Sequence, residues 1–478
     1  MKIELFTLNG SFSHSCLAVR CLKTALFEAG FGEVHSTEGT LRDRTAPLLS
    51  QLVKANAALY SFSCYIWNVV PLLALARDLK AVRPDCRIVL GGPEVSFDTD
   101  RFTALDYIDT VITGEGEEAI VALAKMLEKG EPLPRLLEGT PDRRFTARGT
   151  HYGKNEDASA LVYYEGSRGC PFSCTFCLSS ATTGVRAKSA EQVLDDLLEF
   201  EHLSGAKTVK LVDRTFNFDR ERAKKIWQGL LSPEYTKCYH FEIAAHLLDE
   251  ESFEILSRFP EGKVRLEIGL QSTNPNTLAA VCRHVSAKST LEAAARLKAA
   301  GNVHVHLDLI AGLPLEDYRS FAASFDAAYP VCDVLQLGFL KLLHGTALCR
   351  DAEKYGIVAS ATPPYTVLKT ASLSFEELDR LHGISDILDR LHEKGNFAHS
   401  LYFLLAHTPS PFAFFEGFLD YLKKTTDRPL QGIAQRELFQ MLWDYGKSLL
   451  NQGLHDDFRA HLTADFTAFE TRRAPKFI

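Results

Sequence analysis

The sequence predicts an α/β protein in three parts: a doubly wound parallel sheet, then an incomplete β/α barrel, and finally a helical C-terminal region. Three observations lead to this prediction. Short apolar runs alternate with helical patterns over residues 1 to about 130, six further strand-and-helix units follow, and apolar residues adopt helical spacing beyond Pro363-Pro364. At 478 residues the chain is also too long for one ordinary hydrophobic core.

The composition narrows the class of protein. A hydrophobic content of 46% with 24% charged residues is typical of globular chains. The formal net charge of -8 disfavours a nucleic-acid partner. The first residues lack the long apolar region of a secretory signal, and no run of about 18 apolar residues indicates a membrane span. The eleven cysteines, an odd number, read as reduced thiols and metal ligands, so we expect a cytoplasmic protein without a membrane partner.

The first part carries unusual segments after its strands. Such a sheet binds its ligand at the carboxyl ends of its strands, and glycines there let the backbone approach a ligand closely. No dinucleotide or P-loop motif is present, so a ligand crevice for something other than a phosphate-held nucleotide is favoured. The strand candidates are 3–8, 57–62, 87–90 and 110–112, followed by NGSFSHS, SFSCYIWN, GGPEVSFD and GEGEE, and the helix candidates are 17–26, 69–79 and 117–127.

The second part is separated from the first by a segment rich in proline, glycine and charge, which we interpret as a linker. Active sites of β/α barrels lie at the carboxyl ends of the strands. The barrel strand candidates are 161–165, 208–211, 240–243, 264–270, 304–309 and 334–340. The expected boundaries are 1–135 for the first domain, 136–158 for the linker, 159–365 for the barrel and 366–478 for the helical domain.

The helical region begins with a clear start signal. Ser374 and Glu377 form the pattern of a capping box, and Leu378, Leu381 and Ile384 begin an apolar repeat at helical spacing. Further helical stretches at 411–423 and 436–450 are rich in Phe, Leu and Trp. We expect these aromatic side chains to form a core.

Three cysteines, Cys170, Cys174 and Cys177, occupy a glycine-led loop after the first barrel strand. Structural zinc uses four ligands, usually as two close pairs, and the sequence has no second C-x-x-C. Three thiolates suit a 4Fe-4S cluster that keeps one iron open. An open iron can bind a substrate or cofactor and pass it an electron.

The run C-P-F-S-C-T-F-C, with Phe176 before the last cysteine, resembles the signature of the radical S-adenosylmethionine (SAM) enzymes. In that family the open iron chelates SAM, and reductive cleavage yields a 5′-deoxyadenosyl radical. The segments VDRTFNFD, LEIGLQSTNP, HLDLIAGLP and LQLGFLKLLHGT resemble motifs of the subgroup with an N-terminal cobalamin-binding domain. The resemblance covers essentially the whole chain and implies a Rossmann-like cobalamin-binding domain before a partial (β/α)6 radical SAM barrel.

The resemblance also implies the cofactor contacts. SAM is expected at Phe176 and at polar residues of two strand ends, namely Asp213, Arg214, Asn217, Glu267, Gln271 and Ser272. Cobalamin is expected at the four strand-end segments of the first domain, namely Asn9, Ser11, His14, Ser63, Cys64, Tyr65, Gly91, Gly92, Pro93, Glu94, Gly114, Glu115 and Gly116. The D-x-H-x-x-G pattern is missing, so we do not expect a lower histidine ligand of that kind, and His14 reads as a hydrogen-bonding residue.

The function implied by the resemblance is methylation of a carbon centre, with one SAM methylating cobalamin and a second SAM cleaved at the cluster. Two alternatives stay open. Cobalamin radical chemistry without methyl transfer, such as ring contraction or cyclisation, would use the same cofactors, and a metal-binding accessory protein of RNA modification is disfavoured by the acidic balance. The implied partners are a small-molecule or peptide substrate and an electron donor such as flavodoxin or ferredoxin.

Overall fold

The structure is a computed structural model that describes residues 1–153, 160–181 and 184–470. The chain divides into two compact units. Unit 1 comprises Met1–Leu266, Lys341–Asp351 and Ser360–Thr366, and unit 2 comprises Glu267–Leu340, Ala352–Ala359 and the chain from Val367 onward. Parts of three predicted segments lie outside the described residues: 154–158 of the linker, 159 and 182–183 of the barrel, and 471–478 of the helical domain.

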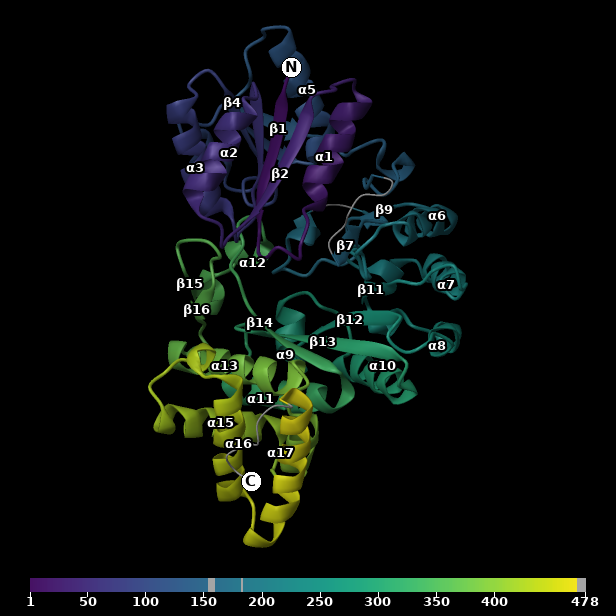
Figure 1. Ribbon diagram of the computed structural model, residues 1–478, viewed down its shortest axis with the longest axis vertical. Coiled ribbons are helices and arrows are strands. Elements are labelled where there is room, and N and C mark those ends of the chain that lie inside the picture. The colour runs from purple at the N-terminus through teal and green to yellow at the C-terminus, as the bar shows by residue number, and fades with distance from the viewer. Residues whose placement is uncertain (154–159, 182–183, 471–478) are drawn as a thin grey trace. The chain divides into compact units, whose positions relative to one another are not determined.

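Unit 1 begins with a six-stranded parallel sheet in the order β2-β1-β3-β4-β5-β6. The order reverses between β1 and β3, which is where a doubly wound sheet opens its ligand crevice. Figure 1 shows α1 and α5 on one face of this sheet, with α2 and α3 on the other. The bounds are β1 Ile3–Asn9, α1 Leu17–Glu28, β2 Val34–Thr40, α2 Thr45–Ala55, β3 Leu59–Ser63, α3 Val69–Val82, β4 Arg87–Gly91, α4 Thr99–Thr103, β5 Thr110–Gly114, α5 Gly116–Glu128 and β6 Leu136–Gly139.

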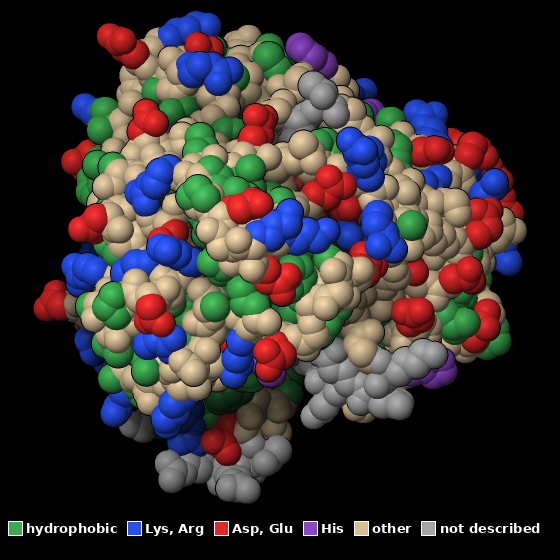
Figure 2. All heavy atoms as spheres, turned by 90° about the horizontal axis from the view of Figure 1, so that it is seen from above, with side chains coloured by type: hydrophobic (Ala, Val, Ile, Leu, Met, Phe, Trp, Pro, Cys, Tyr) green, Lys and Arg blue, Asp and Glu red, His purple; other side chains and the backbone are tan. Residues whose placement is uncertain are grey.

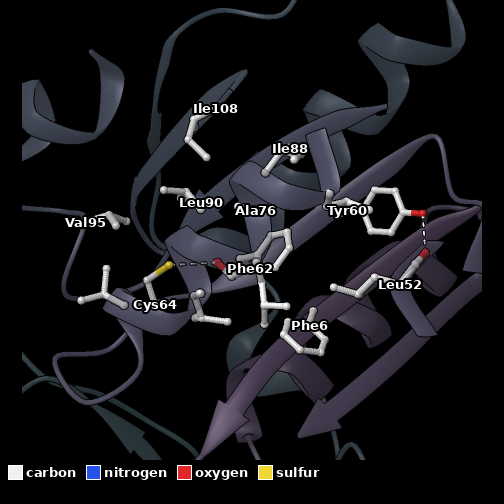
Figure 3. Packing of buried hydrophobic residues seen from close by; sticks show 14 of the residues in the cluster. Phe6, Leu52, Tyr60, Phe62, Cys64, Ala76, Ile88, Leu90, Val95 and Ile108 are labelled. Carbon is white, nitrogen blue, oxygen red and sulfur yellow. Dashed lines mark hydrogen bonds between the residues drawn. The ribbon is translucent and has the colours of Figure 1, made fainter. Parts of the chain in front are cut away.

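The strands that the sequence predicted are those with side chains buried on both faces, because such strands form continuous apolar runs. Figure 3 shows one of the two cores, in which Phe6, Tyr60, Phe62 and Ile88 pack together. The sequence does not predict strand β2, because only its first and sixth residues are buried and it therefore contains no apolar run.

The first residues of the predicted linker, which starts at residue 136, belong to the first sheet. Residues Leu136–Gly139 form strand β6 and pair in parallel with Val111–Gly114 of β5. The sequence does not predict this strand, because β6 is a four-residue edge strand without a fully buried side chain, and prolines and charges surround it. The first sheet therefore extends four residues beyond the predicted domain boundary.

The second sheet has the order β14-β13-β12-β11-β10-β7 and contains the six strands expected for the partial barrel. Buried and half-buried side chains alternate along its longer strands, as in β13. A short antiparallel pair, β8 with β9, adjoins the first strand. The bounds are β7 Leu161–Tyr164, β8 Ser167–Arg168, β9 Arg186–Ala187, α6 Ala190–Glu201, β10 Thr208–Leu211, α7 Arg220–Gly229, β11 Cys238–Ile243, α8 Glu250–Ser257, β12 Val264–Gln271, α9 Pro275–Ala280, α10 Ala287–Ala300, β13 Val303–Ala311, α11 Tyr318–Ala328 and β14 Val334–Phe339.

The C-terminal region is helical, as predicted, and its first helix has the predicted capping box at Ser374 and Glu377. Aromatic side chains fill its core: Phe414, Phe418 and Tyr445 lie within 6.3 Å of one another by ring centroid. Two helices, α14 and α17, were not predicted. The bounds are α12 Ala347–Arg350, β15 Val358–Ala359, β16 Val367–Lys369, α13 Phe375–Leu388, a π-helical turn Asp389–Glu393, α14 Ala398–Leu405, α15 Pro411–Thr425, α16 Gln435–Leu449 and α17 His455–Phe469.

Within the described ranges, no helix is both long and apolar enough to cross a membrane.

A substitution of Gly92 can test the close backbone packing at the end of β4. Its φ is +112°, and an added Cβ would lie 2.5 Å from the carbonyl oxygen of Cys64. We expect Gly92→Ala to lower the free energy of unfolding by about 1–3 kcal/mol because the backbone is strained and must shift. Gly10→Ala is the control, since a Cβ there meets nothing within 4 Å. Equal urea midpoints for the two variants would contradict the expectation.

Glu393 gives unit 2 a pH-dependent stability. Burial raises the pKa of Glu393 to about 7, although its carboxylate accepts a hydrogen bond from the Leu335 amide at 3.1 Å. The folded protein therefore binds more protons than the unfolded chain between about pH 4.5 and 7, so stability falls as the pH rises through that window. Glu393→Gln keeps the acceptor oxygen and removes this slope. In melting curves from pH 5 to 8, the melting temperature of Glu393→Gln should rise relative to that of the wild type as the pH rises. The exposed control Glu353→Gln should show no such relative rise.

Candidate cofactor-binding site

The three cysteines lie on an irregular loop between β8 and a 3₁₀ turn at Leu178–Ala181. Cys174 is 8% exposed, and Cys170 and Cys177 are half-buried. The amide of Cys177 donates to the carbonyl of Cys174 at 3.1 Å. Gly169 enters the loop with a φ of +99°, and an added Cβ would lie 2.1 Å from the carbonyl oxygen of Gly184. A glycine is therefore required immediately before Cys170.

The donor set itself favours a cluster over a single zinc ion. A structural zinc site is closed by four ligands. The loop supplies the three thiols of Cys170, Cys174 and Cys177. Three thiolates suit a 4Fe-4S cluster that keeps one iron open.

Asp213, a predicted SAM contact, supports the cluster loop instead. Its fully buried carboxylate accepts hydrogen bonds from the Gly166 amide at 2.8 Å and from the Ser167 hydroxyl at 2.6 Å. Burial raises the pKa of Asp213, and these donors oppose that effect. Arg222 donates to the carbonyl of Gly166 at 3.1 Å. The chain just before the cysteines is thus held by buried side chains of the next strand-and-helix unit.

Asn217 is likewise bound within the protein. Its side-chain amide donates to the carbonyl of Ala244 at 3.0 Å and accepts from the amide of the same residue at 2.9 Å. This pair ties the loop after β10 to the end of β11. Arg214, in contrast, is exposed, and Phe176 is half-buried. Of the predicted SAM contacts in this segment, Arg214 and Phe176 keep surface for a ligand.

The predicted SAM contacts of unit 2 lie on and beyond β12. Glu267 is half-buried, whereas Ser272 is fully buried and accepts from the Asn274 amide at 2.9 Å. Gln271 has a φ of +70°, and its buried Oε1 has no hydrogen-bond partner among the described residues. A buried acceptor without a donor is costly. Gln271 therefore fits a ligand that brings a donor to this strand end.

The carboxyl edge of the first sheet exposes large aromatic side chains. Phe12 follows β1 and is 86% exposed, Trp67 follows β3 and is 49% exposed, and Phe97 follows β4 and is 41% exposed. Asn68 fixes two of these loops, since its amide donates to the carbonyls of Leu8 at 3.0 Å and Ser63 at 3.2 Å. These three side chains offer apolar surface at the edge where a doubly wound sheet binds its ligand.

Cys64, a predicted cobalamin contact, turns its side chain into the core and not toward this surface. The side chain is fully buried in the core that Figure 3 draws, and its thiol donates to the carbonyl of Phe62 at 3.6 Å. Burial raises the pKa of the Cys64 thiol well above its ordinary value. The neighbouring Tyr65 is half-buried and stacks on Trp67 at 4.5 Å between ring centroids. Ser63 is buried as well.

The loop after β1 is held from several sides. Asn9 donates to Glu38 at 2.7 Å and to the carbonyl of His14 at 3.1 Å. The ring of His14 is exposed and its Nδ1 lies 2.5 Å from the hydroxyl of Tyr163 on β7. The His14 ring thus makes a hydrogen bond to a residue of the first barrel strand. Ser11 pairs with Ser13 at 2.7 Å.

The acidic residues of the loops after β4 and β5 have different partners: Glu94 accepts a hydrogen bond from a tyrosine, and Glu115 pairs with arginines. Gly91, Gly92 and Pro93 keep partial exposure, but Glu94 is only 7% exposed and accepts from Tyr365 at 2.5 Å. Gly114 and Gly116 are also partly exposed and flank Glu115, whose carboxylate contacts arginines of the barrel.

Arg168 is the centre of that contact. Its guanidinium pairs with Glu165 at 2.8 Å, Glu115 at 2.7 Å and Glu117 at 2.6 Å, while only 14% of its side chain is exposed. Burial alone would raise the pKa of Glu117, yet Arg168 holds it below its ordinary value. Arg186 of β9 adds a second cation beside Glu115. The acids of GEGEE thus bind the residue two positions before Cys170.

Sequence reasoning missed Arg168 and Tyr365. The only signal for Arg168 was its position two residues before the first cysteine. No feature of the sequence around Tyr365, which follows Pro363-Pro364, indicated its contact with Glu94.

Comparison with known proteins agrees with this geometry. A model of the B12 binding domain matches residues 6–124, and a model of the radical SAM superfamily matches residues 164–328. The chain therefore combines a cobalamin-binding domain with a radical SAM domain, which confirms the resemblance, and these domains imply cobalamin, a 4Fe-4S cluster and SAM as cofactors. A third model, of a protein of unknown function (DUF4080), matches residues 353–478.

The chain is similar to several methyltransferases. It is 27% identical over 298 residues to 2-(S-pantetheinyl)-carbapenam-3-carboxylate methyltransferase of Streptantibioticus cattleyicolor, covering 55% of this chain and 43% of that one. It is 26% identical over 299 residues to the cobalamin-dependent radical SAM methyltransferase TokK of Streptomyces tokunonensis, with the same coverage. The chain thus spans less than half the length of these two relatives.

Solved structures share the fold. The radical SAM methyltransferase TsrM of Kitasatospora setae, with cobalamin and cluster bound, superposes with a TM-score of 0.66 at 16% identity, covering 87% of this chain and 98% of that one. The cobalamin-dependent radical enzyme OxsB superposes with a TM-score of 0.64 at 13% identity, covering 98% of this chain and 83% of that one. The predicted α/β fold class is therefore confirmed.

The substitution Arg168→Gln tests how much the ion pairs of Arg168 with Glu115, Glu117 and Glu165 stabilise the protein. The substitution leaves Glu117, with 6% of its side chain exposed, without its cation, so we expect a loss of about 3–5 kcal/mol in the free energy of unfolding. Arg186→Gln is the matched control, because 37% of that side chain is exposed and it pairs only with Glu115 among the described acids. A loss of at most about 1 kcal/mol is expected there. Urea unfolding checks both values, and similar losses in the two variants would refute the special role of Arg168.

Proposed function

We propose that this protein is a cobalamin-dependent radical SAM methyltransferase that methylates a carbon centre of a small-molecule or peptide substrate. The single observation that carries the proposal is the joining of two cofactor sites in unit 1. The cysteine loop of the barrel and the strand-end loop Gly114–Gly116 of the cobalamin-binding domain meet at the ion pairs of Arg168. Two relatives that each cover 55% of this chain are named as methyltransferases, which supports the transfer of a methyl group.

The chain's own residues provide position and shielding. Cys170, Cys174 and Cys177 would hold the cluster, and Arg214 of the same unit would meet SAM. When bound, the cluster supplies the electron that cleaves one SAM, and cobalamin carries the methyl group of another SAM to the substrate. The buried supports Asp213 and Asn217 keep the strand ends fixed during this chemistry. Such positioning is the main contribution of a protein to cofactor chemistry.

We also propose the domain limits 1–139 for the cobalamin-binding domain, 161–365 for the barrel and 366 onward for the helical domain. A dedicated electron donor such as flavodoxin or ferredoxin, and a cytoplasmic location, follow from this function. A nucleic-acid substrate is disfavoured. Figure 2 shows basic and acidic side chains interspersed over the face that it presents, and the formal charge of the chain is -8.

Cys174→Ala tests the cluster assignment. The variant should lose the cluster's iron and its brown absorbance after anaerobic reconstitution, and 5′-deoxyadenosine formation from SAM under reduction should fall at least about a hundredfold. Cys238→Ala is the control, since Cys238 lies on β11 outside the cysteine loop. A Cys174 variant that keeps both iron and SAM cleavage would contradict the assignment.

Methyl transfer itself is tested with SAM labelled in its methyl group. Reduced enzyme holding cobalamin should form S-adenosylhomocysteine and 5′-deoxyadenosine, and mass spectrometry of the product should find the label. If 5′-deoxyadenosine forms but the product carries no label, methylation is contradicted. The alternative, cobalamin radical chemistry without methyl transfer, is then supported.

A further inference from the structure

A two-part segment of unit 1, here named the clamp, comprises Lys341–Asp351 and Ser360–Thr366. Its two parts hold each other: Lys341 bridges to Thr366, and the amide of Leu342 donates to the carbonyl of Tyr365 at 2.9 Å. The ring of His344 packs edge-on against Tyr365 at 4.9 Å between centroids. Both parts of the clamp belong to unit 1, although residues of unit 2 precede and follow each of them in the sequence.

The clamp binds the cysteine loop by a backbone hydrogen bond. The amide of Leu348 donates to the carbonyl of Thr175 at 2.9 Å, and Thr175 lies between the second and third cysteines. Leu348 is 1% exposed and belongs to α12, whose N-terminus is capped by the Thr346 hydroxyl. A capped and buried helical turn therefore fixes this end of the contact.

The clamp also binds the loop after β4. The Tyr365 hydroxyl donates to Glu94 at 2.5 Å and accepts from Arg101 at 3.0 Å. Burial raises the pKa of Glu94, and the Tyr365 hydrogen bond opposes that effect. Gly345 packs against the ring of Phe97, where an added Cβ would lie 2.3 Å from a ring carbon. Tyr365 is 3% exposed, so this hydroxyl is a buried link.

From these contacts we infer that the clamp sets the distance between the cobalamin loop after β4 and the cysteine loop, with Tyr365 as its positioning residue. The inference rests on the proposed function, because it names the loops by their cofactors. Its physical basis is separate: the two linked parts of the clamp hydrogen-bond both loops, and Glu94 directly follows Gly91-Gly92-Pro93. Small misplacements of reacting groups reduce rates steeply, so such a device matters for transfer between cofactors.

The test uses the full chain holding both the cluster and cobalamin, with Tyr365→Phe as the variant. The spin coupling between the reduced cluster and cob(II)alamin, measured by electron paramagnetic resonance, reports their separation directly. We expect a single narrow distance in the wild type and a distribution at least about twofold broader in Tyr365→Phe, with iron content unchanged. Tyr235→Phe is the matched control, because its buried hydroxyl donates to the Leu194 carbonyl at 3.1 Å away from both loops.

Hydrogen exchange keeps the inference testable without cofactors. Amides of residues 92–98 and 174–177 should exchange about tenfold faster in Tyr365→Phe than in Tyr235→Phe. Glu94→Gln should reproduce part of this effect, and the double variant should be less than additive because the two side chains act through one bond. Wild-type-like exchange and coupling in Tyr365→Phe would overturn the clamp, whereas a wild type that binds no cobalamin would overturn the proposed function instead.

Discussion

The arrangement of unit 1 depends on the guanidinium of Arg168. Three carboxylates surround it at 2.6–2.8 Å, and two of them, Glu115 and Glu117, come from the start of helix α5, directly after strand β5. A cation this deeply buried is costly to desolvate, and only close and complete pairing compensates the cost. The pairing is therefore strict in geometry, and it lies two residues from the first ligand cysteine. The entrance of the cysteine loop, which has little regular structure, is fixed by this side chain together with the buried Asp213 and Arg222.

The polar residues at the strand ends fall into two physical groups. Asp213, Asn217 and Ser272 are fully or almost fully buried, and protein groups satisfy their hydrogen bonds. Buried polar groups of this kind fix loops because leaving them unpaired is expensive. Arg214 is exposed, and Gln271 carries a buried oxygen without a partner among the described residues. Side chains of the second group have capacity left for a ligand, and both groups occur within the same motifs.

Two links between the cobalamin-binding domain and the barrel side of unit 1 differ in kind. The Arg168 centre is ionic and ties β5 to the entrance of the cysteine loop, while the Tyr365–Glu94 hydrogen bond ties β4 to the clamp. A third contact joins His14 to Tyr163. Together they hold the loops of three strand ends, β1, β4 and β5, which is the edge where a doubly wound sheet binds its ligand.

The sequence by itself determined the strands buried on both faces, the six barrel strands, the capping box of α13 and the three cysteines, because each leaves a periodic or spaced pattern along the chain. It did not reveal β2 or β6, since edge strands have few buried side chains. Only the tertiary structure decided that Cys64 faces the core, that Asp213 supports the loop beside it, and that Tyr365 reaches Glu94 across 271 positions. Local sequence shows which residues are polar or apolar. The partner that satisfies a buried polar group is chosen by the fold, because that partner can lie anywhere along the chain.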